Sequence, residues 1–251
     1  MLYYYFMYFI IYSFIGWIYE STFRTITHKK IINSGFLNGP LIPIYGFGAT
    51  SIVLLFYNDN LSFIPLFLSS MVVTTILEYI TSYLMEKIFN ARWWDYSDKP
   101  FNINGRVYLL GALVFGSFSV IVINYVHPHI INLVSKISMN SIYIISASMF
   151  IILLYDFSYT TINLLNLDKK IKKLELKIQT FTGKDIISPS DLKEYLKYKI
   201  SSDLEDHKSL MSSADKHKAQ IKRLIKTFPK LSFNRNKHIW EALKEKLDNK
   251  D

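Results

Sequence analysis

The feature that most constrains this chain is the absence of charged residues from long apolar stretches. Asp, Glu, Lys and Arg are missing from residues 2–19, 31–58, 60–77, 107–126 and 137–155. A helix rises ~1.5 Å per residue, so roughly 20 residues of this kind cross a hydrocarbon core about 30 Å thick. The sequence therefore predicts an all-α fold, an integral membrane helical bundle of about five transmembrane helices.

The basic residues between these stretches indicate how the helices are oriented. The only Lys or Arg in the second and fourth loops is Lys136. The first and third loops contain Arg24, Lys29, Lys30, Lys87, Arg92, Lys99 and Arg106. Because cytoplasmic loops collect Lys and Arg, we expect a multi-pass protein of the inner membrane with its N-terminus outside and its C-terminal tail in the cytoplasm.

The charge distribution predicts two domains, a transmembrane bundle over residues 1–164 and a cytoplasmic helical tail over residues 165–251. The tail holds 21 Lys and Arg against 13 Asp and Glu, so it carries +8 of the net charge of +9. Its expected partner is the anionic inner leaflet of the bilayer. Nucleic acid is not expected, because the tail has no recognisable nucleic-acid-binding signature and its charge is mixed.

Apolar residues in the tail recur at helical spacing. Over residues 164–181 they follow a three-four pattern with Lys and Glu between them, which predicts that the last span continues as an amphipathic helix. Such a helix could pair with a second copy in a homo-oligomer. Further helices are expected after Ser188 and before Pro229.

The stretch before the second span is rich in glycine and proline. Six of its residues disfavour a regular helix, namely Gly35, Gly39, Pro40, Pro43, Gly46 and Gly48. We expect the helix to begin near Leu41, with Pro43 in its first turn, where a missing N–H does no harm. A re-entrant segment and a plain loop followed by a helix both remain open, since irregular backbone at membrane depth needs protein or water partners.

Three carboxylates in or near the spans, Glu20, Glu78 and Asp156, all map to the cytoplasmic half. An ionised group in hydrocarbon costs several kcal/mol, so such residues face a cavity or a partner. A shared inward-facing polar site is the first hypothesis, with Glu78 and Asp156 turned towards the bundle interior. The alternative is structural: Glu20 is interfacial, and Glu78 pairs with Arg24 or Arg106.

The third loop adds polar and aromatic side chains on the same side. We expect it to fold back onto residues 35–45, so that both loops build one site. The candidate residues of this site are Glu20, Arg24, Gly35, Asn38, Gly39, Pro40, Pro43, Tyr45, Glu78, Trp94, Asp95, Asn102, Asn104, Arg106 and Asp156. Trp93 and Trp94 are most simply part of the inner aromatic belt.

Other chemistry is not indicated. His127 and His129 are expected to be solvated on the outer face, and no metal site or cofactor is expected. The chain has no Cys, no phosphate-binding Walker A motif and no nucleophile signature, so no catalytic residue can be named.

Five motifs in the first 165 residues are shared with one known family. They are Gly16-Trp-Ile-Tyr-Glu20, the Gly35 to Gly46 segment, Glu78-Tyr-Ile-Thr-Ser82, Trp94-Asp-Tyr-Ser97 and Phe101-Asn-Ile-Asn-Gly-Arg106. In order and spacing the chain resembles the bacterial membrane proteins called putative ABC-transporter type IV, or CmpB-like. The resemblance implies an inner-membrane permease subunit that uses a separate ATP-binding subunit.

These observations favour a transporter-type membrane subunit with an inward-facing polar site. One alternative is a membrane-embedded enzyme acting on lipid or cell-envelope precursors, with Glu78, Asp95 or Asp156 as general acid or base. Another is a non-catalytic sensor or scaffold whose tail binds anionic lipid. The sequence does not predict the substrate.

Overall fold

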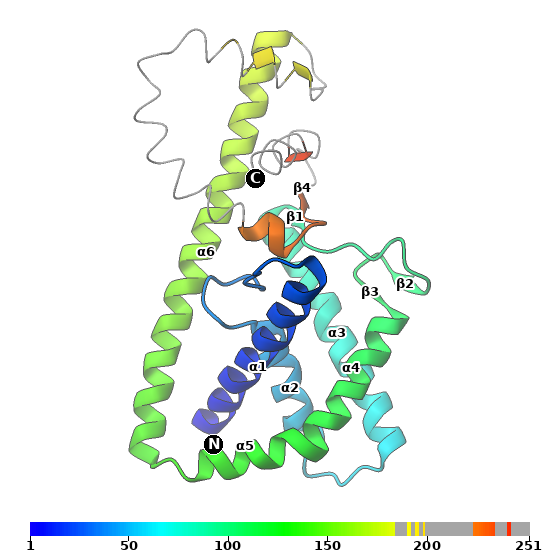
Figure 1. Cartoon of the computed structure of the whole chain (residues 1–251), viewed down its shortest axis with the longest axis vertical. Helices are drawn as coiled ribbons and strands as arrows, with labels where there is room; N and C mark the ends of the chain where they lie inside the picture. The colour runs from blue at the N-terminus through cyan, green and yellow to red at the C-terminus, as the bar shows by residue number, and fades with distance from the viewer. Residues whose placement is uncertain (184–189, 192–193, 196–197, 199–222, 234–239, 242–251) are drawn as a thin grey trace. The chain divides into compact units, whose positions relative to one another are not determined.

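A computed structural model describes residues 1–183, 190–191, 194–195, 198, 223–233 and 240–241. It is mostly helical (Figure 1). The helices are α1 (Leu2–His28), α2 (Pro43–Phe56), α3 (Phe63–Phe89), α4 (Leu109–Ile121), the π-helix η1 (Val122–Val126), α5 (His127–Ser135) and α6 (Met139–Thr182). Short strands are β1 (Ala91–Arg92), β2 (Asn102–Ile103), β3 (Val107–Tyr108) and β4 (Ser232–Phe233).

Four helical segments are long and apolar enough to cross a bilayer. They are Leu2–His28, Phe63–Phe89, Leu109–Ser135 and Met139–Leu167. Large apolar side chains on these helices are exposed, such as Ile64 at 67% and Ile144 at 68%, as lipid-facing residues must be. The chain is thus a multi-pass membrane protein, and the four segments together with the shorter apolar α2 account for the five helices expected.

The second apolar stretch differs from the expectation in length. Only 14 residues form α2, which begins at Pro43 with the proline in its first turn, as expected. Residues 29–42 are not helical. Gly35 has a φ of 101°, and a Cβ there would lie 2.8 Å from Cγ1 of Ile42, so glycine fits both the backbone and the space.

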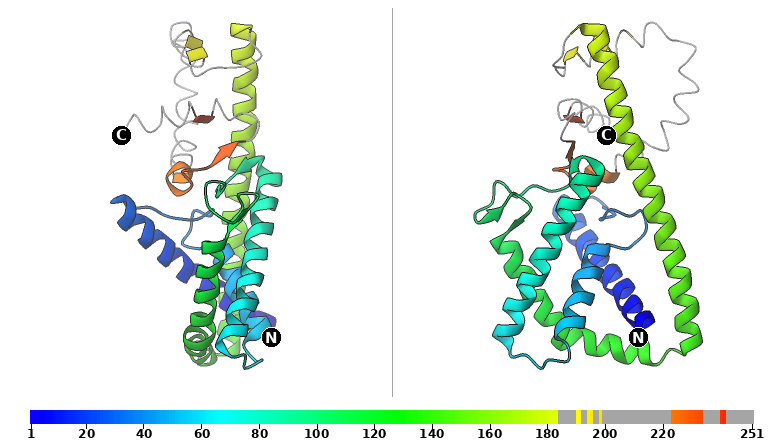
Figure 2. Two further views of the ribbon diagram at one scale, coloured as in Figure 1. Left: turned by 90° about the vertical axis from the view of Figure 1, so that its right-hand side faces the viewer. Right: turned by 180° about the vertical axis from the view of Figure 1, so that it is seen from behind.

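The fourth stretch continues further than expected and changes direction. α4, η1 and α5 follow one another without a break, and both Figure 1 and the right panel of Figure 2 show α5 running across the end of α4. A π-helical turn shifts the register of the backbone hydrogen bonds, and Pro128 just beyond it removes a donor. The part in line with α4 ends near Val126, although the stretch without Asp, Glu, Lys or Arg continues to Ser135.

The chain divides into two compact units. The first contains residues 1–84 and 95–160, and the second contains residues 85–94 and 161–251. In the first unit α1 packs on α2, and Gly16 and Gly46 allow the approach. A Cβ at Gly16 would lie 2.5 Å from Tyr45, and one at Gly46 would overlap Ser13. The domain boundary expected at residue 164 stays a prediction.

The second unit contains a small aromatic core that the sequence did not predict. β1 pairs antiparallel with β4, placing Ala91 opposite Phe233. Trp93 is buried and meets the ring of Phe228 edge-on at 4.9 Å, so its expected place in the aromatic belt was wrong. The helix over residues 223–227 ends before Pro229, as expected. Most of the segment after Ser188 lies outside the described residues.

The continuation of the last span is confirmed. α6 runs 44 residues as one helix. Two members of its apolar stripe, Leu164 and Ile178, are 3% and 0% exposed.

Candidate functional site

Asp156 of α6 holds the backbone of the non-helical segment before α2. Its Oδ1 accepts hydrogen bonds from the N–H of Asn38 at 3.1 Å and from the Asn38 side chain at 2.9 Å. Its Oδ2 accepts the N–H of Gly39 at 2.7 Å. Thr160, one turn later, accepts a second bond from the Asn38 side chain at 2.8 Å. We call this arrangement of Asp156, Thr160, Asn38 and Gly39 the clasp.

The same segment is tied to α1 along its length. The indole of Trp17 donates to Oδ1 of Asn33 at 2.6 Å, and the N–H of Ser34 donates to Ser21 at 3.1 Å. Near α2, the N–H of Ile42 donates to the carbonyl of Ser13 at 3.0 Å. Irregular backbone within an apolar bundle therefore finds its partners in α1 and α6.

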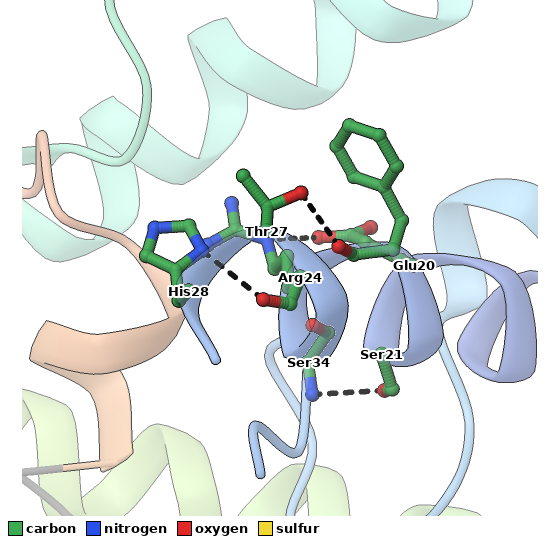
Figure 3. A network of polar contacts seen from close by, with 7 residues as sticks. Glu20, Ser21, Arg24, Thr27, His28 and Ser34 are labelled. Carbon is green, nitrogen blue, oxygen red and sulfur yellow. Dashed lines mark hydrogen bonds and ion pairs between the residues drawn. The ribbon is translucent and has the colours of Figure 1, made fainter. Parts of the chain in front are cut away.

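The second half of α1 carries an ion pair (Figure 3). Nε of Arg24 lies 3.2 Å from Oε1 of Glu20, one helical turn away, and the hydroxyl of Tyr45 hydrogen-bonds the same carboxylate. On the other side of the helix in Figure 3, Ser21 meets Ser34. Glu20 thus links α1 to the start of α2 as well as to Arg24.

Glu78 of α3 is in a different situation. It is 8% exposed, and no described residue forms a hydrogen bond or an ion pair with it. Arg24 pairs with Glu20, and Arg106 donates to Ser82 at 3.2 Å, so the structural alternative, in which Glu78 pairs with either arginine, was wrong. The side chain instead lines a cavity of about 250 Å³ within the first unit.

The cavity lies between α1, α2, α3, α4 and η1 and is open on one side, where lining residues such as Tyr19 and Ile121 are 45% and 46% exposed. Apart from Glu78, its lining is apolar, aromatic or hydroxyl-bearing. The lining residues that matter below are Tyr12, Tyr19, Tyr45, Gly48, Thr74, Phe115, Phe118 and Ser119. Of these lining residues, only Tyr45 and Glu78 were site candidates in the sequence analysis, because the convergence of helix faces depends on packing.

Most hydroxyl groups of this lining already have partners in the protein. Thr74 donates to the carbonyl of Ser70 at 2.7 Å, and Ser119 donates to that of Phe115 at 2.8 Å. Tyr45 is bound to Glu20, and Tyr12 to His127. Glu78 is the carboxyl group of the lining and has no such bond to any described residue.

The third loop forms a hairpin that rests on α3. β2 pairs with β3, and the turn between them places Asn104 and Gly105 at φ of 53° and 65°. Asn104 donates to the hydroxyl of Tyr79 at 2.9 Å, and the guanidinium of Arg106 lies 5.7 Å from the centre of that ring. Asn104 and Arg106 therefore position the hairpin against α3.

Two other candidates stabilise the loop itself. Asp95 accepts the N–H and the hydroxyl of Ser97 at 2.9 and 2.6 Å. Asn102 accepts the N–H of Gly105 at 2.9 Å and donates to the carbonyl of Lys99 at 2.7 Å. These side chains thus hold local turns.

Tyr96 brings the loop into electrostatic range of Glu78 and Glu20. Burial raises the pKa of Tyr96, and the nearby Glu78 raises it further, so its hydroxyl stays protonated at neutral pH. The expected fold-back of the whole loop onto residues 35–45 stays a prediction. Trp94 is half-buried in the second unit, and Pro40 is exposed beside the clasp.

His127 was expected in solvent and is instead buried. It is 1% exposed, and its Nδ1 lies 2.8 Å from the hydroxyl of Tyr12. The rings of Tyr8 and Tyr57 meet it edge-on at 4.9 and 4.5 Å. Its position at the turn from η1 into α5 points it back into the bundle, which the sequence spacing did not indicate. Among the described residues no cluster of His, Asp and Glu could hold a metal ion.

The structure thus brings the predicted residues together in groups. Asn38, Gly39 and Asp156 form the clasp, Glu20, Arg24 and Tyr45 form a linked set, and Glu78 lines the cavity. A comparison with protein families matches residues 7–161 to the family described as Putative ABC-transporter type IV. The chain belongs to this family. The match covers α1 to α6 of the first unit, including the clasp, the cavity and the hairpin. No curated protein and no solved structure matches the chain.

Proposed function

We propose that the protein is the permease-like membrane subunit of an ABC-type transporter and that it binds its substrate in the Glu78 cavity. The observation that carries this proposal is the cavity of about 250 Å³ with one buried carboxyl group that no described residue bonds. An intramembrane ionisable residue marks a substrate or ion pathway more often than a structural contact. Ligand sites are likewise mostly apolar with few polar groups.

Energy coupling would come from a separate ATP-binding subunit, because the chain has no Walker A motif. The hairpin offers it a contact surface. Phe101, just before β2, and Ile103, within it, are 79% and 56% exposed and lie outside the apolar spans. Exposed apolar side chains on a rigid turn are typical of interaction surfaces. The hairpin rests on α3, the helix that carries Glu78, so a contact at Phe101 and Ile103 would be linked to the cavity.

Copurification tests this function. The tagged full-length chain is purified in mild detergent from the cells that naturally produce it, and vanadate-sensitive ATP hydrolysis is measured. We expect activity well above that of a mock purification, together with a protein that carries Walker A and B motifs. A double variant, Phe101→Ser with Ile103→Ser, should lose most of both.

Lys99→Ser is the matched control, because Lys99 lies in the same loop and its side chain is half exposed. It should retain the copurified ATPase. If the wild-type preparation contains no ATPase activity above the mock level, the permease proposal is wrong. If both variants behave as wild type, the hairpin is not the coupling element.

A further inference from the structure

We propose that the Glu78 cavity selects amphiphilic organic cations, compounds with an ammonium group on an apolar ring system or alkyl chain. The proposal deepens the proposed function and rests on the same cavity. It follows from the charge, the aromatic content and the size of the lining.

The charge of the lining has one sign. Among the described lining residues, Glu78 is the single acidic residue, and none is Lys, Arg or His. Anionic ligands would therefore bring a second negative group next to a carboxyl in a medium that does not screen it. A neutral ligand could offer the carboxyl at most a hydrogen bond, whereas an ammonium group would also balance its charge.

The aromatic content of the lining favours the same ligand. Tyr12, Tyr19, Tyr45, Phe115 and Phe118 all contribute to the wall. Aromatic faces attract ammonium groups, and the attraction grows when water is excluded. A buried carboxyl combined with several aromatic rings is therefore the chemistry that recognises an ammonium group.

Hydrogen-bonding ligands such as sugars have little to bind here. The hydroxyls of Thr74, Ser119, Tyr12 and Tyr45 are already bonded within the protein. A ligand with many hydroxyl groups would lose its water and gain few partners beyond the Glu78 carboxyl, at a cost for each unmatched group. The cavity therefore favours one polar head and an apolar body.

The size of the cavity sets the scale of that body. At about 250 Å³ it exceeds the ~150 Å³ cavity that accommodates benzene in another protein. It has room for a ring system or a medium-length alkyl chain, and octyltrimethylammonium is a suitable probe. Octyl sulfate and octanol have the same chain with a negative or a neutral head.

Thiol protection measures binding at the site itself. The chain has no Cys, so Thr74→Cys places a single thiol in the cavity wall, one turn from Glu78. The protein is reconstituted in nanodiscs of phosphatidylglycerol, and the rate of its reaction with N-ethylmaleimide is followed by mass spectrometry. We expect octyltrimethylammonium to slow the reaction at least about tenfold, and octyl sulfate and octanol to have much less effect.

Two changes in the cavity sharpen the test. Adding Glu78→Gln should raise the half-protecting concentration of octyltrimethylammonium at least tenfold, about 1.4 kcal/mol, while Glu78→Asp should keep most of the protection. Adding Gly48→Leu should abolish protection. Gly48 lines the cavity and a Cβ there would meet nothing within 4 Å, so a leucine side chain can occupy the space that the ligand needs. Ile76→Cys is the control thiol, because Ile76 is 51% exposed on the outer surface of α3. Its reaction with N-ethylmaleimide should not be slowed by octyltrimethylammonium.

The source of the ammonium group is tested by changing the lipid. If amine-bearing headgroups occupy the cavity, Thr74→Cys should be protected in phosphatidylethanolamine nanodiscs without any added cation. Protection by added octyltrimethylammonium alone indicates a free amphiphile, and either result supports the proposed ligand class. Equal protection by the three octyl compounds, or protection that Glu78→Gln leaves unchanged, would overturn it. Such a result would leave the copurification test of the permease function untouched.

Discussion

Asp156 illustrates how one carboxylate can organise a segment of irregular backbone. Its two oxygens accept the N–H groups of Asn38 and Gly39 and a side-chain bond from Asn38. Hydrogen bonds to a charged acceptor are about twice as strong as neutral ones, and in an apolar surrounding the N–H groups have few alternatives. Asp156 therefore has a structural explanation that Glu78 lacks.

Replacement of Asp156 tests the clasp. In Asp156→Asn one oxygen becomes an NH₂ group, which cannot accept the bonds of the backbone. We expect the free energy of unfolding to fall by roughly 1–3 kcal/mol, the cost of a buried donor left without an acceptor. Thermal unfolding in detergent and the rate of proteolysis within residues 29–42 would report the change.

Asp98→Asn is the matched control, because the Asp98 side chain is 58% exposed and its pairing with Lys99 at 3.8 Å is loose. It should change stability little. An Asp156→Asn protein with wild-type stability and wild-type protection from protease would show that the clasp does not hold the segment.

Some residue-level features could be read from the sequence and others could not. The rarity of intramembrane carboxylates was enough to single out Glu78 and Asp156. The Asn104-Gly105 pair is a strong hairpin signal that could have predicted the turn between β2 and β3. The contact of Asp156 with Asn38 joins residues 118 positions apart and has no local signal.

At the scale of the helices, the glycines of α2 differ in what surrounds them. A Cβ at Gly46 would overlap Ser13 and lie 2.7 Å from Phe9, both on α1. A Cβ at Gly48, two residues later, would meet nothing within 4 Å. The first glycine allows α1 and α2 to approach, and the second leaves space beside the cavity.

Alanine at these two positions should therefore have opposite effects. We expect Gly46→Ala to destabilise the protein by about 1–3 kcal/mol, because two backbones would have to separate. Gly48→Ala should be neutral or stabilising by up to ~1 kcal/mol, since alanine favours a helix over glycine. Thermal unfolding of the two purified variants makes the comparison, and a larger loss in Gly48→Ala would contradict the packing of α1 on α2.

Helix boundaries were predictable where a proline or the apolar spacing of the sequence determined them. Pro43 began α2, and the apolar pattern beyond residue 164 continued α6. The turn from α4 into α5 was missed, although Pro128 was a signal for it. The pairing of β1 with β4 was not predictable, because it depends on tertiary contacts between distant residues.

At the scale of the whole molecule, the apolar helices establish a membrane protein, and the basic loops predict its orientation. Single Cys residues in this Cys-free chain would report it. We expect Asn60→Cys and Ser138→Cys to react with an impermeant thiol reagent in intact cells. Asp98→Cys and Gly183→Cys should react only after permeabilisation. Labelling of Asp98→Cys from outside, or protection of both Asn60→Cys and Ser138→Cys, would contradict the predicted orientation.

The short α2 also has a consequence for the lipid around it. Its 14 residues extend only about 21 Å, less than the ~30 Å thickness of the hydrocarbon core. Phe47 and Leu54 on its surface are 61% and 60% exposed, so this side of the molecule contacts acyl chains. Hydrophobic mismatch makes the bilayer thin next to such a helix, whereas the 27-residue α3 demands no thinning. The protein thus meets lipid of unequal thickness around its circumference, and shorter acyl chains will gather preferentially beside α2.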